Sequence, residues 1–121
     1  MILGLRTACY PVTDMAIGRA WYSKVLGVEP YFDEPFYVGF NVGGFELGLI
    51  PDGTPGSGGV GVFWGVLDAA LALERLAGLG AIVHEPLKEV GGGIKVGSVK
   101  DPFGNVFGVI ENPQFDPKSV R

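Results

Sequence analysis

Three polar residues that could bind a ligand or take part in a reaction lie close together on one predicted β-hairpin. Gly43-Gly44 separates two strand-like runs, and a pair of glycines favours a two-residue hairpin loop. This loop fixes the register and places Asn41 opposite Glu46, and directly paired residues share a sheet face. Tyr37, Asn41 and Glu46 are therefore predicted on one face. The opposite face is predicted to be apolar and to pack on a helix, with Phe36, Val38, Phe40, Val42, Phe45, Leu47 and Leu49.

Glu46 is the best candidate for chemistry among them. A partly buried carboxylate can accept a hydrogen bond from a ligand, pair with a ligand cation, or act as a base when its pKa is raised. Tyr37 and Asn41 would add the few convergent polar groups that a ligand pocket needs. The simpler alternative makes Glu46 an exposed sheet residue, Asn41 a turn-favouring residue and Tyr37 a cover over the sheet.

The single cysteine and the single histidine carry weaker signals. No His or Lys is adjacent to Cys9 in the sequence to lower its pKa, so a small buried thiol is favoured over a reactive one. A surface or strand-end position is favoured for His84. The stretch 56–61 matches G-x-G-x-x-G but leads into a strand rather than a helix, so a dinucleotide site is rejected.

Composition narrows the class of protein. A chain of 121 residues fits one domain, and 47% hydrophobic with 18% charged residues excludes intrinsic disorder. The net charge of −4 argues against nucleic acid and anionic membrane surfaces as partners. No apolar run reaches the roughly 20 residues of a membrane span. One cysteine and the absence of a signal-peptide pattern favour a cytoplasmic location.

A weak internal repeat organises the chain. Asp14 and Asp68 are predicted to cap two helices that end at Gly27 and Gly80. Each helix is preceded by one strand-like run and followed by three, so the order β-α-β-β-β occurs twice. The predicted strands are 3–10, 29–32, 36–42, 45–50, 60–66, 81–83, 94–99 and 106–110. The predicted buried helix faces are Ile17, Ala20, Trp21 and Val25 in the first helix and Leu73, Leu76 and Ala77 in the second. We expect a first module at 1–52, a linker at 53–59, a second module at 60–112 and a tail at 113–121.

Three motifs join this repeat: W-Y-x-x-x-L-G at 21–27, G-F-E-L-G-L at 44–49 and D-P-F-G-N at 101–105. Together they resemble the vicinal oxygen chelate superfamily of glyoxalases, bleomycin-resistance proteins and extradiol dioxygenases, over nearly the whole chain. The resemblance implies an α+β fold in which two βαβββ modules form an incomplete, barrel-like cupped sheet around a cleft, with helices outside. It also implies a homodimer, since small members commonly dimerise.

The resemblance bears on metal binding as well. Metal-dependent members place one ligand on each of four strands, and the matching positions here are Thr7, Glu46, Gly61 and Gly108. Only Glu46 retains the expected ligand, so we predict no metal and no cofactor, with a divalent metal at Glu46 as the alternative. The same alignment places four further residues on the cleft side: Thr7, Cys9, Phe63 and Ile110.

The favoured function is binding of a small, partly apolar molecule in the cleft, for example drug sequestration in the manner of bleomycin-resistance proteins. Glycine at two ligand positions leaves room for such a molecule, and the carboxylate suits a cationic or hydroxylated one. One alternative is a metal-dependent lyase, isomerase or dioxygenase-type enzyme. Another is a regulatory or partner-binding domain with a vestigial cleft.

Overall fold

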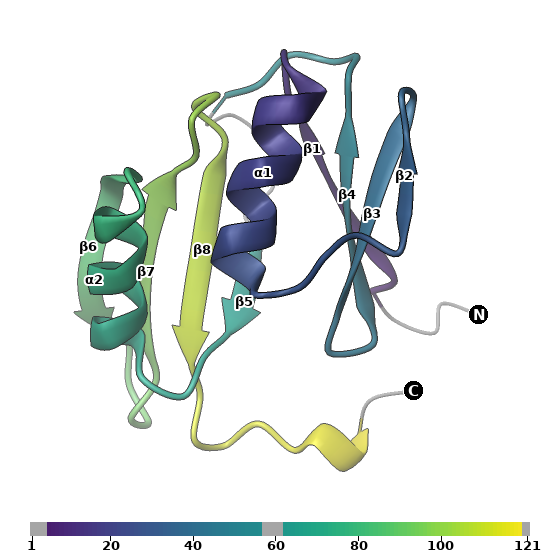
Figure 1. The fold of residues 1–121 in the computed structure, drawn as a ribbon. Coiled ribbons are helices and arrows are strands. Elements are labelled where there is room, and N and C mark those ends of the chain that lie inside the picture. The colour runs from purple at the N-terminus through teal and green to yellow at the C-terminus, as the bar shows by residue number, and fades with distance from the viewer. Residues whose placement is uncertain (1–4, 57–61, 120–121) are drawn as a thin grey trace. The chain divides into compact units, whose positions relative to one another are not determined.

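The computed structural model describes residues 5–56 and 62–119, and each stretch contains one α-helix and one four-stranded sheet (Figure 1). The chain divides into a first unit, Leu5–Gly56, and a second unit within Ser57–Arg121. The α+β fold of two βαβββ modules is confirmed. The candidate ligand position Gly61 lies outside the described residues. Neither α-helix of the described chain is long and apolar enough to cross a membrane.

The first unit has the sheet order β1-β4-β3-β2, with β1 parallel to β4 and the other pairs antiparallel. Its elements are β1 (Thr7–Pro11), α1 (Met15–Leu26), β2 (Phe32–Glu34), β3 (Tyr37–Val42) and β4 (Phe45–Ile50). The Asp14 side chain caps α1 by accepting a hydrogen bond of 3.0 Å from the Ile17 N–H, and Gly27 ends the helix in the left-handed region at φ 72°. Both helix boundaries were predicted.

The β3–β4 hairpin has the predicted register. Asn41 pairs with Glu46 and Gly39 with Gly48. Val38, Phe40, Leu47 and Leu49 are buried on the apolar face. The prediction was wrong for Phe36, which is 66% exposed because it precedes the first residue of β3 and its ring meets Phe32 instead, with ring centroids 6.0 Å apart.

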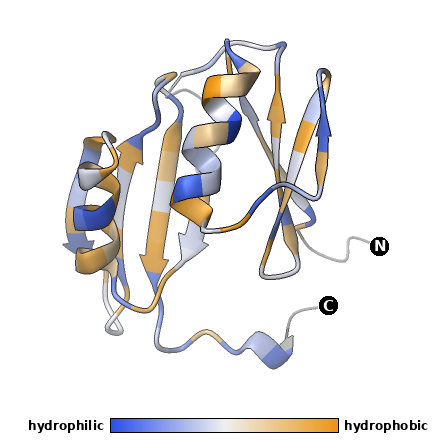
Figure 2. Ribbon diagram, viewed as in Figure 1, coloured by the Kyte–Doolittle hydropathy of each residue, from blue (hydrophilic) through white to orange (hydrophobic). Residues whose placement is uncertain are grey.

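The helices are amphipathic (Figure 2), but their buried faces differ from the predicted ones. In α1 the buried residues are Gly18, Trp21 and Tyr22, whereas Ile17 is 54% exposed and Ala20 is exposed. A Cβ atom on Gly18 would lie only 3.2 Å from Val12 Cγ1, so the glycine lets the helix approach the chain closely.

The second unit repeats this plan with the sheet order β5-β8-β7-β6. Its elements are β5 (Phe63–Gly65), α2 (Ala69–Gly78), β6 (Ile82–Glu89), β7 (Lys95–Lys100), β8 (Val106–Glu111) and a 3-10 helix (Pro117–Ser119). Asp68 caps α2 as predicted. The buried residues of α2 are Ala69, Leu73 and Leu76, and Ala77 is exposed, which corrects the predicted face.

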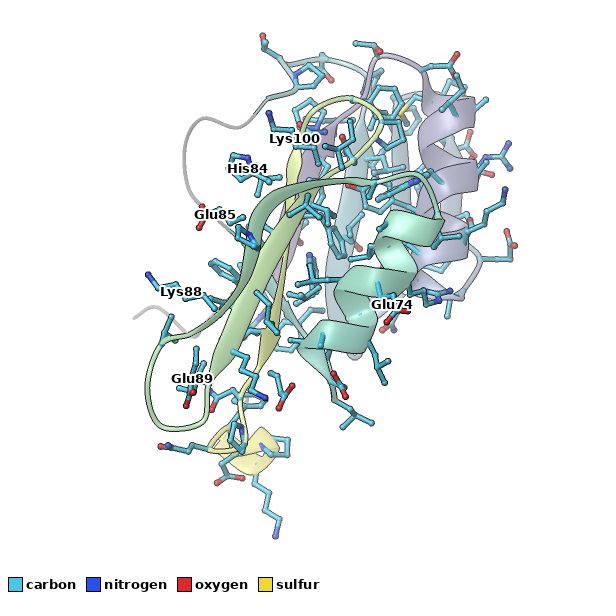
Figure 3. All side chains as sticks on the ribbon, turned by 90° about the vertical axis from the view of Figure 1, so that its left-hand side faces the viewer. Glu74, His84, Glu85, Lys88, Glu89 and Lys100 are labelled. Atoms are coloured by element: carbon cyan, nitrogen blue, oxygen red, sulfur yellow. The ribbon has the colours of Figure 1, made fainter. Side chains whose placement is uncertain are left out.

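Strand β6 differs most from its prediction. It extends to Glu89 rather than ending at residue 83, and all eight of its residues are exposed. Its pairing with β7 shifts register twice, between Val83 and Glu85 and between Glu85 and Lys88. Figure 3 shows His84, Glu85, Lys88 and Glu89 following one another along this outermost strand. The exposure of His84 agrees with the predicted surface position.

Candidate functional site

Glu46 on β4 is half-buried and is held by two tyrosines. The Tyr31 hydroxyl donates a hydrogen bond to one carboxylate oxygen, Oε1, and the Tyr37 hydroxyl donates to the other, Oε2. Tyr37 is the first residue of β3, on the face it was predicted to share with Glu46. Tyr31 precedes β2, and its backbone N–H donates to the Gly39 carbonyl at 3.0 Å. Both carboxylate oxygens are therefore engaged by phenols of the same unit.

Two paired glycines make this arrangement possible. A Cβ atom on Gly48 would lie 2.6 Å from Tyr37 Cζ, and one on Gly39 would lie 3.1 Å from Tyr31 Cε1. No side chain fits at Gly48 unless the ring of Tyr37 moves, and the space at Gly39 is tight. The tyrosine rings therefore lie against bare backbone, which brings their hydroxyls to Glu46.

The cluster presents hydrogen-bond acceptors. A phenol has one O–H donor, and Tyr31 and Tyr37 each direct theirs to Glu46, so only their lone pairs remain. An ionised carboxylate has about four lone-pair sites, of which two are occupied here. The hydrogen bond to Glu46 raises the pKa of Tyr31, and burial followed by the same bond raises that of Tyr37, so both phenols keep their protons at neutral pH.

Cys9 lies on β1 opposite Gly48, and it is exposed rather than buried as predicted. The side chains of β1 alternate, and Cys9 faces the same side as Glu46 instead of the core. Partial burial and then the charge of Glu46 raise the pKa of its thiol, although the Tyr37 hydroxyl lowers it in part. A raised pKa keeps the thiol protonated and makes it a poor nucleophile, in line with the predicted lack of reactivity.

A hollow of about 330 Å³ adjoins Glu46. Its polar walls are Arg6, Thr7, Tyr31, Asn41 and Glu46. Phe45 adds apolar surface, whereas Phe40, also in the lining, has a fully buried side chain. Thr7 pairs with Glu46 across β1 and β4. The Asn41 side chain accepts a hydrogen bond of 2.9 Å from the Gly44 N–H, so it closes the hairpin turn as well as lining the hollow.

Sequence analysis missed Tyr31 and Arg6. Tyr31 lies in the connection before β2, far from Glu46 in the sequence, so no short sequence pattern predicts their contact. The only available signal for Arg6 was its position next to Thr7, one of the residues predicted on the cleft side.

Phe63 and Ile110 belong to the second unit, and their predicted place beside Glu46 stays a prediction. Phe63 on β5 is 50% exposed and pairs with Gly108 on β8. Ile110 is half-buried and pairs with Gly65. A Cβ atom on Gly108 would lie 2.7 Å from Phe63 Cδ1 and 2.6 Å from the Val62 carbonyl oxygen. The ring and backbone around Gly108 thus fill the space that a metal-ligating side chain there would need, so the expectation that this glycine leaves room for a ligand was wrong.

The described residues do not fit the metal centre that the resemblance implies. The position of Thr7 has neither an imidazole nor a carboxylate, and Gly108 has no room for a carboxylate. Within 5–56 and 62–119, no three His, Cys, Asp or Glu residues gather in a way that would hold an ion. The absence of a cofactor stays a prediction.

Comparisons with solved structures give the same fold at low sequence identity. The fosfomycin resistance protein FosX from Listeria monocytogenes has a TM-score of 0.77 and 15% identity, over 98% of each chain. A superfamily member from Sphaerobacter thermophilus has a TM-score of 0.76 and 23% identity, over 92% of this chain and 98% of that one. A lactoylglutathione lyase from Agrobacterium tumefaciens has a TM-score of 0.70 and 22% identity, over 89% and 92%.

Sequence comparison supplies the family. No curated protein sequence matches the chain. The family model described as "Glyoxalase/Bleomycin resistance protein/Dioxygenase superfamily" matches residues 4–109, which is most of the chain and runs from before β1 into β8. The chain belongs to the glyoxalase/bleomycin resistance protein/dioxygenase superfamily.

Proposed function

We propose that this chain binds a small, partly apolar molecule that carries a hydroxyl or an ammonium group, with Glu46 at the centre of the site. The observation that carries the proposal is the pair of phenol hydrogen bonds on Glu46. Because both phenol O–H groups already donate to Glu46, the cluster can offer a ligand only hydrogen-bond acceptors. Phe45, which is half-buried in the lining of the adjoining hollow, supplies apolar surface for the body of the ligand.

Drug sequestration is the version to test first. The family description names bleomycin resistance proteins, and one structural relative is named a fosfomycin resistance protein. Binding without chemical conversion needs no activated water and no polarised carbonyl. This accords with the phenol-held state of Glu46 and with the lack of space at Gly108.

The test is a panel of amines, alcohols and donor-free apolar compounds of equal size, screened by thermal shift and measured by calorimetry. A ligand at one hundred times its Kd stabilises the folded state by about 2.7 kcal/mol. We expect amines and alcohols to raise the Tm and donor-free compounds to leave it unchanged. Glu46→Gln should weaken binding about tenfold or more, because hydrogen bonds to charged groups are worth about 1.5–3 kcal/mol. Glu89→Gln, on the exposed strand β6, is the matched control. A panel without a single binder would refute the proposal.

We also propose that the site works without a metal centre. Elemental analysis after expression in medium supplemented with Zn, Ni, Mn and Fe is the check. A stoichiometric metal that disappears in Glu46→Gln would establish the metal-dependent alternative instead.

We propose a homodimer, as the resemblance implied. Apolar side chains remain exposed in both units, among them Ile17 and Leu67, and such surface favours association. Light scattering behind size exclusion should give twice the chain mass of 12.8 kDa. A mass equal to one chain at micromolar concentration would rule the dimer out.

A further inference from the structure

We propose that Arg6 is an anion-binding residue of this site, and that the ligand is a small dipolar molecule with an anionic group at one end and a hydroxyl or ammonium donor at the other. The inference rests on the proposed function and narrows its ligand class. Its starting point is that the hollow is lined by one cationic residue, Arg6, and one anionic residue, Glu46.

Arg6 and Glu46 are neighbours through the backbone. The Glu46 N–H donates to the Arg6 carbonyl at 3.0 Å, where β1 begins alongside β4. Among the described residues, however, the side chains of Arg6 and Glu46 do not form an ion pair with each other, unlike those of Arg19 and Asp33. Two residues of opposite charge therefore line one hollow without pairing.

Glu46 and Arg6 differ in how far their side chains are already engaged. Tyr31 and Tyr37 each bind one oxygen of Glu46 and so fix the direction of the carboxylate. Arg6 has five N–H donors, and in the described chain its side chain makes one hydrogen bond, a long contact of 3.3 Å from Nη1 to the Leu5 carbonyl. The guanidinium thus retains donors for an anionic group, while the Glu46 cluster retains acceptors.

The size and lining of the hollow define the ligand further. Its volume of about 330 Å³ equals the space of roughly eleven water molecules at about 30 Å³ each. Phe45 gives the hollow apolar surface as well. A molecule with a short hydrocarbon spacer between its anionic and donor ends would meet all three kinds of surface. Amino and hydroxy derivatives of small carboxylates or phosphonates belong to this class.

The experiment uses three probes that share a six-carbon chain and differ in their end groups: 6-aminohexanoate, hexanoate and hexylamine. The flexible chain makes the test independent of the span between Arg6 and Glu46. Binding to the full chain is followed by calorimetry and by NMR titration. We expect 6-aminohexanoate to bind about tenfold more tightly than hexylamine. Arg6→Gln should remove this advantage and leave the affinity for hexylamine unchanged. Glu46→Gln should lower the affinity for hexylamine and leave the affinity for hexanoate unchanged.

Two further variants serve as controls for the role of the Arg6 charge. Arg6→Lys keeps the charge and should keep part of the advantage, and Arg75→Gln on α2 is the matched control in the second unit. The inference is overturned if the wild-type chain does not prefer 6-aminohexanoate over hexylamine, or if Arg6→Gln weakens both equally. If the wider panel contains binders but none of the three probes binds, the dipolar ligand is refuted and the proposed function survives. If no compound of either set binds, the proposed function itself fails.

Discussion

Gly48→Ala tests the packing that brings the Tyr37 hydroxyl to Glu46. The new methyl group would lie 2.6 Å from Tyr37 Cζ and 2.8 Å from Cε1, so the ring must rotate away and the hydroxyl must leave the carboxylate. Overpacking costs about 1–3 kcal/mol. A lost hydrogen bond to a charged group costs about 1.5–3 kcal/mol when buried, and less at this partly exposed site. Alanine returns about 0.5–1 kcal/mol through its better strand propensity. We expect a net loss of about 1–2 kcal/mol in the free energy of unfolding.

The assay is urea denaturation followed by circular dichroism, with Gly65→Ala as control. Gly65 also lies in a strand, and a Cβ atom there would meet nothing within 4 Å. In a Tyr37→Ala background the cost of Gly48→Ala should fall to that of the control, since the clashing ring is gone. An equal cost in both backgrounds, or no cost in the wild-type background, would refute the reasoning.

Three other predictions concern the site and the second unit. First, stability should fall as the pH rises above the ordinary tyrosine pKa of 10.0, because burial raises the pKa of Tyr37 in the folded chain. The resulting stabilisation is complete below pH 10.0 and is lost progressively as the pH rises toward the higher folded-state pKa. Urea midpoints between pH 8 and 11 should show the fall, and Tyr31→Phe with Tyr37→Phe should make the curve flatter; a slope unchanged in the double variant would contradict the assignment. Second, Glu46→Gln should speed alkylation of Cys9 at pH 8 by roughly twofold or more, because the charge of Glu46 helps to raise the pKa of the thiol. Iodoacetamide labelling followed by mass spectrometry measures the rate, which Glu89→Gln should leave unchanged. Third, Asp101→Ala should cost about 2–3 kcal/mol in thermal denaturation, because it leaves buried donors without an acceptor. The Asp101 side chain accepts hydrogen bonds of 2.8 Å from the Phe103 N–H and of 2.9 Å from the Asn105 N–H. A loss of less than about 1 kcal/mol in the free energy of unfolding would show that water or a rearranged turn replaces these bonds.

Features set by neighbouring residues could be predicted from the sequence. Asp14 caps a helix through an N–H three residues away, and two glycines close a hairpin through φ angles of 59° and 91°. The hairpin register then put Tyr37 and Glu46 on one face. Each of these features depends on residues a few positions apart, so it can be predicted without knowing the tertiary contacts.

Features set by distant contacts could not be predicted in this way. Hydropathy ranks Ile17 above Gly18 as a core residue, but the close approach to Val12 favours the residue without a side chain. Tyr31 reaches Glu46 only after two strands fold back between them. The alignment placed Cys9 on the side of Glu46, and the pairing of β1 with β4 agrees, but the sequence did not show that the thiol would be exposed on that face.

Strand β6 also limits how this protein can assemble. An outermost strand with exposed backbone is a template on which further chains can add, and long flat edges of this kind seed aggregates. Here Pro86 lacks the N–H that a ladder needs, Lys88 and the neighbouring glutamates would bring charge to the junction, and the two register shifts make the edge uneven. Among the described strands the sheet of the second unit ends at β6, and we expect these features to disfavour growth of aggregates along this edge.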